Sequence, residues 1–163
     1  MINNPTRDNA IHDLVESMCE TLKYFEMPEA RLNSAYAPGK WTARFILVHL
    51  ADTEAVLLER LKRLASETSP TLMAFDQDRW AENLFYATRD IGLARLQFES
   101  ARRGVLELIR SLPAGIESKS GTHSEAGTRS FGQIQAMILS HSKHHNEQLK
   151  AIAEGRTWTP APK

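Results

Sequence analysis

Three histidines of this 163-residue chain lie at positions where they could bind a divalent metal ion together. His141 and His145 are four residues apart, and residues at this spacing are neighbours on one face of an α-helix. Both imidazoles can then turn toward one ion, with metal–nitrogen bonds of about 2.1 Å. A His-x-x-x-His pair also occurs by chance, so the pair alone is compatible with two hydrogen-bonded core histidines.

His49 supplies the third candidate ligand from another part of the chain. It interrupts an apolar stripe that includes Ile46 and Leu50. Metal sites in helical bundles are built from side chains on facing helices, and an unpaired buried polar group costs about 1 to 3 kcal/mol. We therefore predict a metal site formed by His49, His141 and His145 in preference to three separately hydrogen-bonded core histidines.

The remaining histidines are weaker candidates. His144 could replace His145, because an i, i+3 pair with His141 also converges on a helix. His12 is expected to face solvent. His123 lies in a segment rich in small polar residues, from which it could approach the site or remain exposed. The residues alone leave the roles of His123 and His144 open.

Three protein ligands are typical of a catalytic metal site, because they leave a coordination position for water or substrate. An ion held in this way lowers the pKa of a bound water or thiol and so supplies a nucleophile. Asp52 and Gln148 each lie three residues beyond a predicted ligand and are candidates for orienting the imidazoles. Asp52 or Glu54 could also be a general base for hydrolysis. Each could equally be an ordinary hydrogen-bonding group between helices.

Four amphipathic segments must position these side chains. Apolar residues recur at spacings of three and four over residues 8–26, 42–67, 90–112 and 130–155. Thr42 is a predicted N-cap, Ser130 and Gln133 have the spacing of a capping box, and Gly155 is a natural helix end. These patterns predict an all-α fold, an up-down four-helix bundle.

The connections are expected to be mostly irregular. A short helix is predicted around Asp78 to Asn83, and residues 114–127 are predicted to be the longest structureless connection, since no segment shows the alternation of a β-strand. Exposed aromatic residues are expected at Trp80, Tyr86 and Trp158, where they could contribute to a homodimer.

The composition is that of one folded domain spanning residues 1–163, with 42% apolar and 25% charged residues. Lysine and arginine total 20, as do aspartate and glutamate, so no net charge favours nucleic-acid or membrane-surface binding. No apolar run of about 18 residues predicts a membrane span. Cys19, the single cysteine, is expected to be a small core residue, and a cytoplasmic location is the expectation.

Several short motifs resemble the DinB/YfiT-like superfamily of four-helix metal proteins. They occur in the family's order at residues 40–42, 48–52, 123–127 and 141–145, followed by Gln148. In that family one histidine after a tryptophan-led helix start and a His-x-x-x-His pair on the last helix bind a divalent metal, zinc or nickel. The resemblance implies His49, His141 and His145 as these ligands, and it favours His145 over His144.

The same resemblance suggests the type of reaction. Members of the family include transferases that join thiols such as bacillithiol or mycothiol to electrophiles, a thiol-dependent isomerase, and proteins described only as metal-dependent hydrolases. We therefore expect a metal-dependent thiol S-transferase acting on a small-molecule substrate. The alternatives are a hydrolase that uses metal-bound water, and a non-catalytic binding protein stabilised by its metal.

Overall fold

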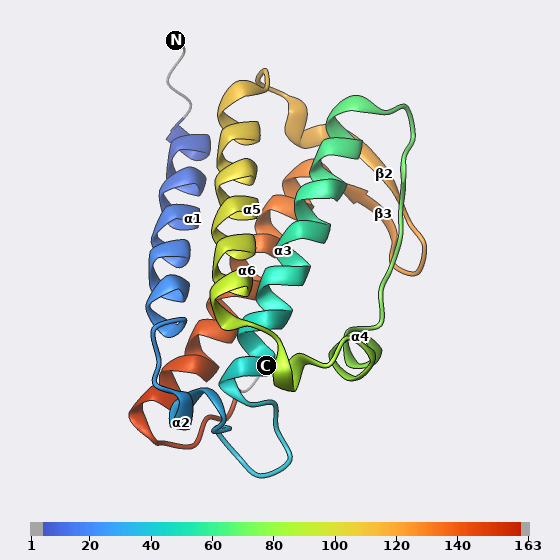
Figure 1. The fold of residues 1–163 in the computed structure, drawn as a ribbon. Helices are drawn as coiled ribbons and strands as arrows, with labels where there is room; N and C mark the ends of the chain where they lie inside the picture. Colours follow the sequence, from blue (N-terminus) through green and yellow to red (C-terminus); the bar gives the residue numbers. More distant parts are fainter. Residues whose placement is uncertain (1–4, 161–163) are drawn as a thin grey trace.

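Four long helices dominate the computed structural model, which describes residues 5–160 (Figure 1). They are α1 (Pro5–Tyr24), α3 (Ala43–Ser66), α5 (Ile91–Ser111) and α6 (Phe131–Glu154). Each falls on a segment with the helical apolar period, so the predicted all-α four-helix bundle is confirmed. Shorter helical segments are α2 (Glu29–Leu32), α4 (Gln77–Asn83), and the 3₁₀ turns η1 (Tyr86–Thr88) and η2 (Ile116–Ser118).

The predicted helix ends are formed by the expected capping interactions. The Thr42 hydroxyl accepts a hydrogen bond from the Phe45 backbone N–H at the start of α3. Ser130 and Gln133 form a reciprocal capping box at the start of α6. Gly155 ends α6 in the left-handed conformation with φ of 68°, which glycine adopts without steric cost.

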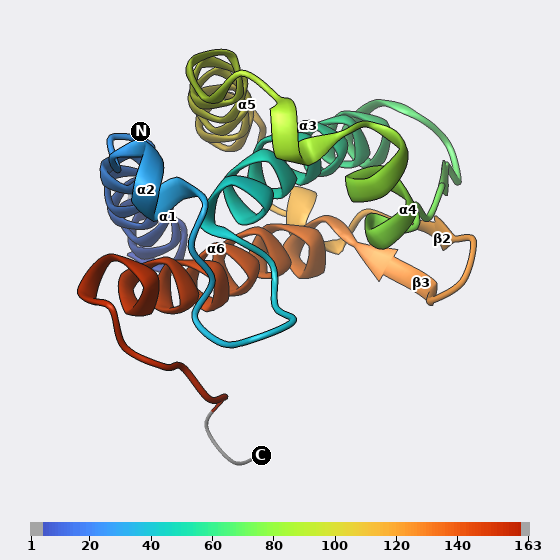
Figure 2. The same cartoon turned by 60° about the horizontal axis from the view of Figure 1, so that its bottom comes forward.

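The four helices do not alternate strictly in direction. Figure 2 shows α1 and α3 at opposite corners, each packed between α5 and α6. α3 and α5 run parallel, as do α1 and α6 (Figure 1). The connection over residues 67–90 allows this order, because it returns along the bundle and α5 therefore starts at the same end as α3.

A small sheet closes one side of the bundle, contrary to the prediction of a structureless segment at residues 114–127. β1 (Thr71–Leu72) pairs in parallel with β2 (Ser120–His123), which forms an antiparallel hairpin with β3 (Gly127–Ser130). Gly121 lies so near Pro70 that a Cβ would be 2.5 Å from the proline carbonyl oxygen. The strands are two to four residues long and lack apolar alternation, so the sequence carried no signal for them.

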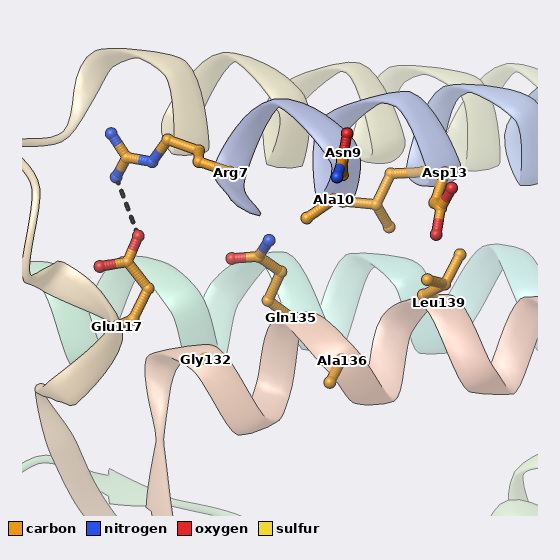
Figure 3. Close-up of a pocket in the computed structure, with 10 residues that line it drawn as sticks. Arg7, Asn9, Ala10, Asp13, Glu117, Gly132, Gln135, Ala136 and Leu139 are labelled. Atoms are coloured by element: carbon orange, nitrogen blue, oxygen red, sulfur yellow. Dashed lines mark ion pairs between the residues drawn. The ribbon is translucent and has the colours of Figure 1, made fainter. Parts of the chain in front are cut away.

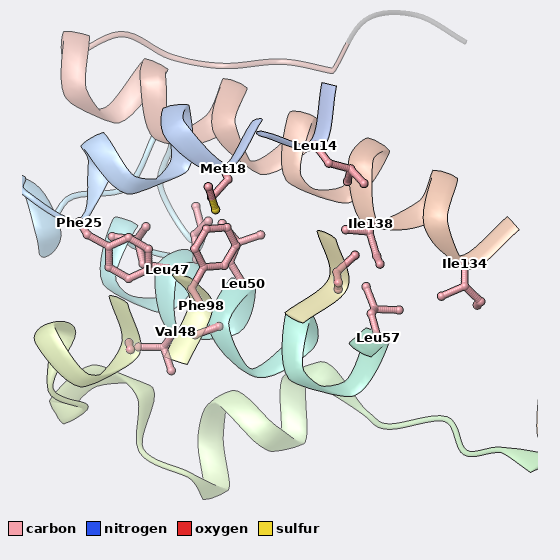
Figure 4. Packing of buried hydrophobic residues seen from close by; sticks show 14 of the residues in the cluster. Leu14, Met18, Phe25, Leu47, Val48, Leu50, Leu57, Phe98, Ile134 and Ile138 are labelled. Atoms are coloured by element: carbon pink, nitrogen blue, oxygen red, sulfur yellow. The ribbon is translucent and has the colours of Figure 1, made fainter. Parts of the chain in front are cut away.

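The hydrophobic core lies where the four long helices meet. Figure 4 shows buried side chains from all of them packed together: Leu14 and Met18 of α1, Leu47, Leu50 and Leu57 of α3, Phe98 of α5, and Ile134 and Ile138 of α6. Each fully buried side chain of this size stabilises the fold by roughly 1.5 to 3 kcal/mol. Within the described part of the chain, no helix has both the length and the apolar character needed to cross a bilayer.

Four residues lie differently from what was expected, and two of them, Trp80 and Trp158, are half-buried rather than exposed. Cys19 is exposed rather than part of the core, because it is one residue, or about 100°, past the buried Met18 on α1. Tyr86 is fully buried rather than exposed, and its hydroxyl donates a hydrogen bond to Asp52 at 2.7 Å. Tyr86 is therefore not available for a dimer interface.

A buried ion pair joins the four long helices. Arg102 of α5 is 0% exposed and Glu54 of α3 is 2% exposed. The guanidinium donates to both carboxylate oxygens of Glu54, at 2.5 and 2.9 Å, and to the Ser142 hydroxyl of α6. It also donates to the Leu14 carbonyl and the Ser17 hydroxyl of α1. These contacts use all five N–H groups of the arginine, and they leave Glu54 unavailable as the general base that the sequence suggested.

We predict that Glu54→Gln lowers the free energy of unfolding by about 3 to 5 kcal/mol, because it leaves the Arg102 charge buried without a counter-charge. Urea unfolding followed by circular dichroism measures this difference. The control is Glu59→Gln on the same helix, which removes an exposed ion pair with Arg63 and should change stability by less than about 1 kcal/mol. Equal effects of the two substitutions would contradict the structural role of the buried pair.

Candidate metal site

The structure brings the three predicted histidines together. His49 of α3 faces His141 and His145 of α6, and the centres of the three rings are 4.6 to 5.1 Å apart. One nitrogen from each ring lies within 4.8 Å of the other two. The shortest separation joins Nε2 of His49 and Nε2 of His141, at 2.9 Å. The arrangement is the one that the spacing predicts, and binding of an ion by these residues stays a prediction.

The three imidazole nitrogens of His49, His141 and His145 suit a divalent ion of intermediate softness. In a tetrahedral site with bonds of about 2.1 Å, the ligand nitrogens lie about 3.4 Å apart. Here one pair of nitrogens is 2.9 Å apart and all three lie within 4.8 Å of one another, a spacing compatible with a shared ion. Three imidazoles suit zinc, nickel or copper, whereas magnesium and calcium prefer oxygen ligands.

Burial keeps the three imidazoles neutral, as metal ligands must be. It lowers the pKa of His49 to about 3 and that of His145 to about 4. The pKa of His141 is lowered further, first by burial and then by the neighbouring histidines and Arg102. The imidazole lone pairs therefore remain available throughout the physiological pH range.

Gln148 orients one of the rings, as the sequence analysis expected of this residue. Its Oε1 lies 2.7 Å from Nδ1 of His145. Because an amide oxygen only accepts, Nδ1 carries the proton and Nε2 presents its lone pair. Two further residues contact His49 and were not singled out: the Thr53 hydroxyl lies 3.4 Å from its Nδ1, and the Trp41 ring packs edge-on against it. Thr53 is four residues beyond His49, a spacing that could have identified it.

Asp52 points away from the histidines. Its carboxylate accepts hydrogen bonds from the Tyr86 hydroxyl at 2.7 Å and from Nε2 of Gln97 at 2.9 Å. This differs from the expected contact with an imidazole, because Asp52 lies about 60° around α3 from His49 and so faces α5 and η1 instead of α6. In this geometry Asp52 does not orient an imidazole ring, and it is not placed to act as a general base for a nucleophile bound at the three histidines.

Of the other histidines, His144 lies beside the site, with its ring centre 5.2 Å from that of His145, whereas His123 and His12 are outside the three-nitrogen group. His144 is exposed, and its ring packs against Trp158 rather than joining the three close nitrogens. Nδ1 of His123 accepts hydrogen bonds from the backbone N–H groups of Glu125 and Ala126, so this ring stabilises the turn between β2 and β3. His12 is exposed, as expected.

A cavity of about 490 Å³ gives small molecules access to the histidines. Such a volume is within the range of small-molecule sites. It is lined by His141, His145, Gln148 and His144, together with Tyr36, Gly39, Lys40, Trp41, Gln77 and Asp78. The histidines therefore combine a set of metal-ligating nitrogens with an approach for a substrate.

A second cavity, shown in Figure 3, lacks such chemistry. It has a volume of about 450 Å³ and lies between α1 and α6, with Arg7 and Glu117 paired at one end. Among the described residues that line it, none is a histidine or cysteine. The histidine cavity is thus the better candidate for an active site.

Comparison with known proteins identifies relatives over nearly the whole chain. The sequence model of the DinB superfamily matches residues 13–149. A protein of Oceanobacillus iheyensis named "Putative metal-dependent hydrolase" is 27% identical over 150 residues, covering 92% of this chain and 86% of its own length. A protein of Bacillus mycoides with the same name is 25% identical over 149 residues, covering 91% and 84%.

Two solved structures share the fold. YfiT from Bacillus subtilis, described as a probable metal-dependent hydrolase with an unusual four-helix bundle topology, superposes with a TM-score of 0.86 at 22% identity. The match covers 96% of this chain and 92% of YfiT. A mycothiol-dependent maleylpyruvate isomerase superposes with a TM-score of 0.72 at 13% identity, covering 88% of this chain and 60% of that one.

We predict that the metal-free chain loses stability as the pH falls from about 6.5 toward 4. An unfolded histidine titrates near 6.5, whereas the three buried histidines have lowered pKa values. In this interval the unfolded chain therefore binds more protons than the folded chain, and each histidine contributes a slope of up to about 1.4 kcal/mol per pH unit.

Denaturant unfolding with a chelator present, at several pH values, measures this slope. His141→Gln should make the dependence on pH shallower. Ser140→Gln, an exposed substitution one residue earlier on α6, should leave it unchanged. The same slope in the wild type and both variants would show that burial of these rings does not govern the acid sensitivity.

Proposed function

This chain belongs to the DinB superfamily, and we propose that it is a metal-dependent thiol S-transferase. In this proposal His49, His141 and His145 hold one zinc or nickel ion beside the 490 Å³ cavity. The observation that carries it is the convergence of three neutral imidazoles, two of which, His141 and His145, line a cavity open to small molecules. A divalent ion bound there lowers the pKa of an adjacent thiol, so that the thiolate is available near neutral pH.

The protein residues supply position and shielding. Gln148 holds the His145 ring through Nδ1, and the amide Nε2 of Gln148 also reaches the Tyr36 hydroxyl at 3.5 Å. Trp41 covers His49, which is 1% exposed. Contacts with Gln148 and Trp41 therefore hold the rings of His145 and His49 in place. His141 and His145 also line the cavity, from which a cosubstrate can approach.

Neither of the two carboxylates that the sequence suggested as a base for hydrolysis contacts the histidines. A hydrolase needs a general base to accept the proton of water, and the two predicted candidates are engaged elsewhere, Asp52 with Tyr86 and Gln97 and Glu54 with Arg102. A thiol that binds as the thiolate needs no such base. The neighbour that is named as mycothiol-dependent has the same fold and supports a thiol cosubstrate.

A metal-dependent hydrolase is the second candidate. The names of the relatives favour it, and Asp78 of α4 lines the histidine cavity, where a carboxylate could accept the proton of an attacking water. In this reading Asp78, rather than Asp52, is the base.

The two reactions are distinguished by their need for thiol. We expect the zinc- or nickel-loaded chain to join cysteine, glutathione or bacillithiol to 1-chloro-2,4-dinitrobenzene, with one thiol consumed for each chloride released. Mass spectrometry of the thioether and titration of the free thiol measure the product. Activity should fall to the uncatalysed rate after chelation and in His145→Asn, and persist in the exposed variant His12→Asn.

Opposite results have clear meanings. Cleavage of 4-nitrophenyl acetate that requires the metal but no thiol, and that Asp78→Asn abolishes, would replace the transferase with the hydrolase. Turnover that survives both chelation and His145→Asn would exclude the histidine group from either reaction.

A further inference from the structure

A larger cavity lies on the other side of α4 from the histidines. Its volume is about 680 Å³, and its lining residues come from α3, β1, α4, α5 and the segment that leads from β1 to α4. Figure 1 shows where these elements lie. Trp80 of α4 lines it, whereas Gln77 and Asp78 of the same helix line the histidine cavity. The two cavities share no lining residue among those described, so the larger one is separate from the proposed metal site.

The walls of this cavity are partly apolar and aromatic, and besides Asp52 its polar lining residues are Glu59, Arg63, Thr71 and Gln97. The rings of Phe75 and Trp80 pack against each other with their centres 4.5 Å apart and their planes tilted by 40°. Val56 of α3 lies among the other apolar lining residues, and Met73 is 67% exposed.

Residues 71–75, which line the cavity, are held in place by strand pairing and by two further hydrogen bonds. β1 pairs with β2, and the backbone N–H of Ala74 donates to the Ser124 hydroxyl at 2.9 Å. The buried Arg60 donates to the Met73 carbonyl. The cavity is therefore preformed, as small-molecule sites usually are.

The inner end of the cavity carries a carboxylate held by neutral donors. Asp52 has a side chain only 10% exposed, and it accepts hydrogen bonds from the Tyr86 hydroxyl and the Gln97 amide. Burial and the neighbouring Asp52 raise the pKa of Tyr86, so the phenol remains a donor. A carboxylate has about four acceptor positions, and these two donors leave room for another.

The positive charges near Asp52 only partly neutralise the negative charge of its carboxylate. Arg89 lies nearby, with its Nη2 4.0 Å from Oδ1 of Asp52 and its side chain 39% exposed. Arg63 at the rim is already paired with Glu59 and Glu67. The cavity thus combines apolar aromatic walls with a negative charge at its inner end.

We propose that this cavity binds an organic ammonium compound, with the ammonium group on Asp52 and the apolar or aromatic body between Val56, Phe75 and Trp80. The ammonium supplies the charge-assisted donors that the Asp52 carboxylate lacks. This binding is independent of the proposed transferase reaction and of the metal.

Isothermal titration calorimetry with 2-phenylethylammonium as the probe tests the proposal, on the full chain with its metal and again after chelation. We expect saturable binding in both states, and binding at least tenfold weaker for 2-phenylethanol and for 3-phenylpropanoate. Asp52→Asn, which keeps an acceptor for its neighbours, should weaken the ammonium at least tenfold and leave the alcohol unchanged. Unchanged alcohol binding also shows that the variant is folded.

Two matched variants locate the binding. Asp78→Asn makes the same chemical change in the histidine cavity and should leave the affinity unchanged. Arg89→Gln removes the partial counter-charge and should strengthen the ammonium two- to threefold. The proposal is overturned if binding is absent, if it disappears on chelation, if the alcohol binds as well as the ammonium, or if Asp78→Asn weakens it as much as Asp52→Asn.

Discussion

The buried ion pair between Arg102 and Glu54 sets the register on which the rest of the bundle depends. The guanidinium binds groups from α1, α3 and α6 at once, and a displacement of any of these helices along its axis would leave a buried charge or hydroxyl without its partner. Ser142, one of its acceptors, is the residue after His141, and Glu54 lies one residue beyond Thr53. The interaction that aligns α3 with α6 is therefore adjacent to the residues that face each other across the histidine group.

The same alignment determines the chemistry of the two cavities. Positions on one side of α3 present His49 to α6, whereas Asp52, about 60° around the helix, faces α5 and η1. One helix thus contributes a neutral imidazole to the histidine group beside one cavity and a carboxylate to the lining of another. α4 separates the two, because its first residues line the histidine cavity and Trp80 lines the apolar one.

The sequence predicted the features that depend on local spacing. The helical period located the four long helices, and Ser130, Gln133 and Gly155 marked the ends of α6. His141 and His145 were identifiable by their spacing, and the family resemblance favoured His145 over the exposed His144. All of these signals are contained within one or two turns of a helix.

Features that depend on partners from distant segments were not predictable in this way. The order of the bundle and the partners of Asp52 and Glu54 arise from packing between helices, which residue spacing does not encode. The sheet was missed because its strands are short and rich in glycine, serine and threonine. Tyr86 was expected at the surface because an isolated aromatic residue in a connection carries no signal of the carboxylate that its hydroxyl meets.

The most direct test of this account is the metal content of untagged protein, measured by inductively coupled plasma mass spectrometry after incubation with zinc or nickel and removal of free metal. Wild type and His144→Ala should each retain about one ion per chain, and His145→Ala should lose it, because only His145 completes the three-nitrogen group. A wild type that stays metal-free, or a His145→Ala variant that retains its ion, would contradict the account and leave the three residues as core histidines.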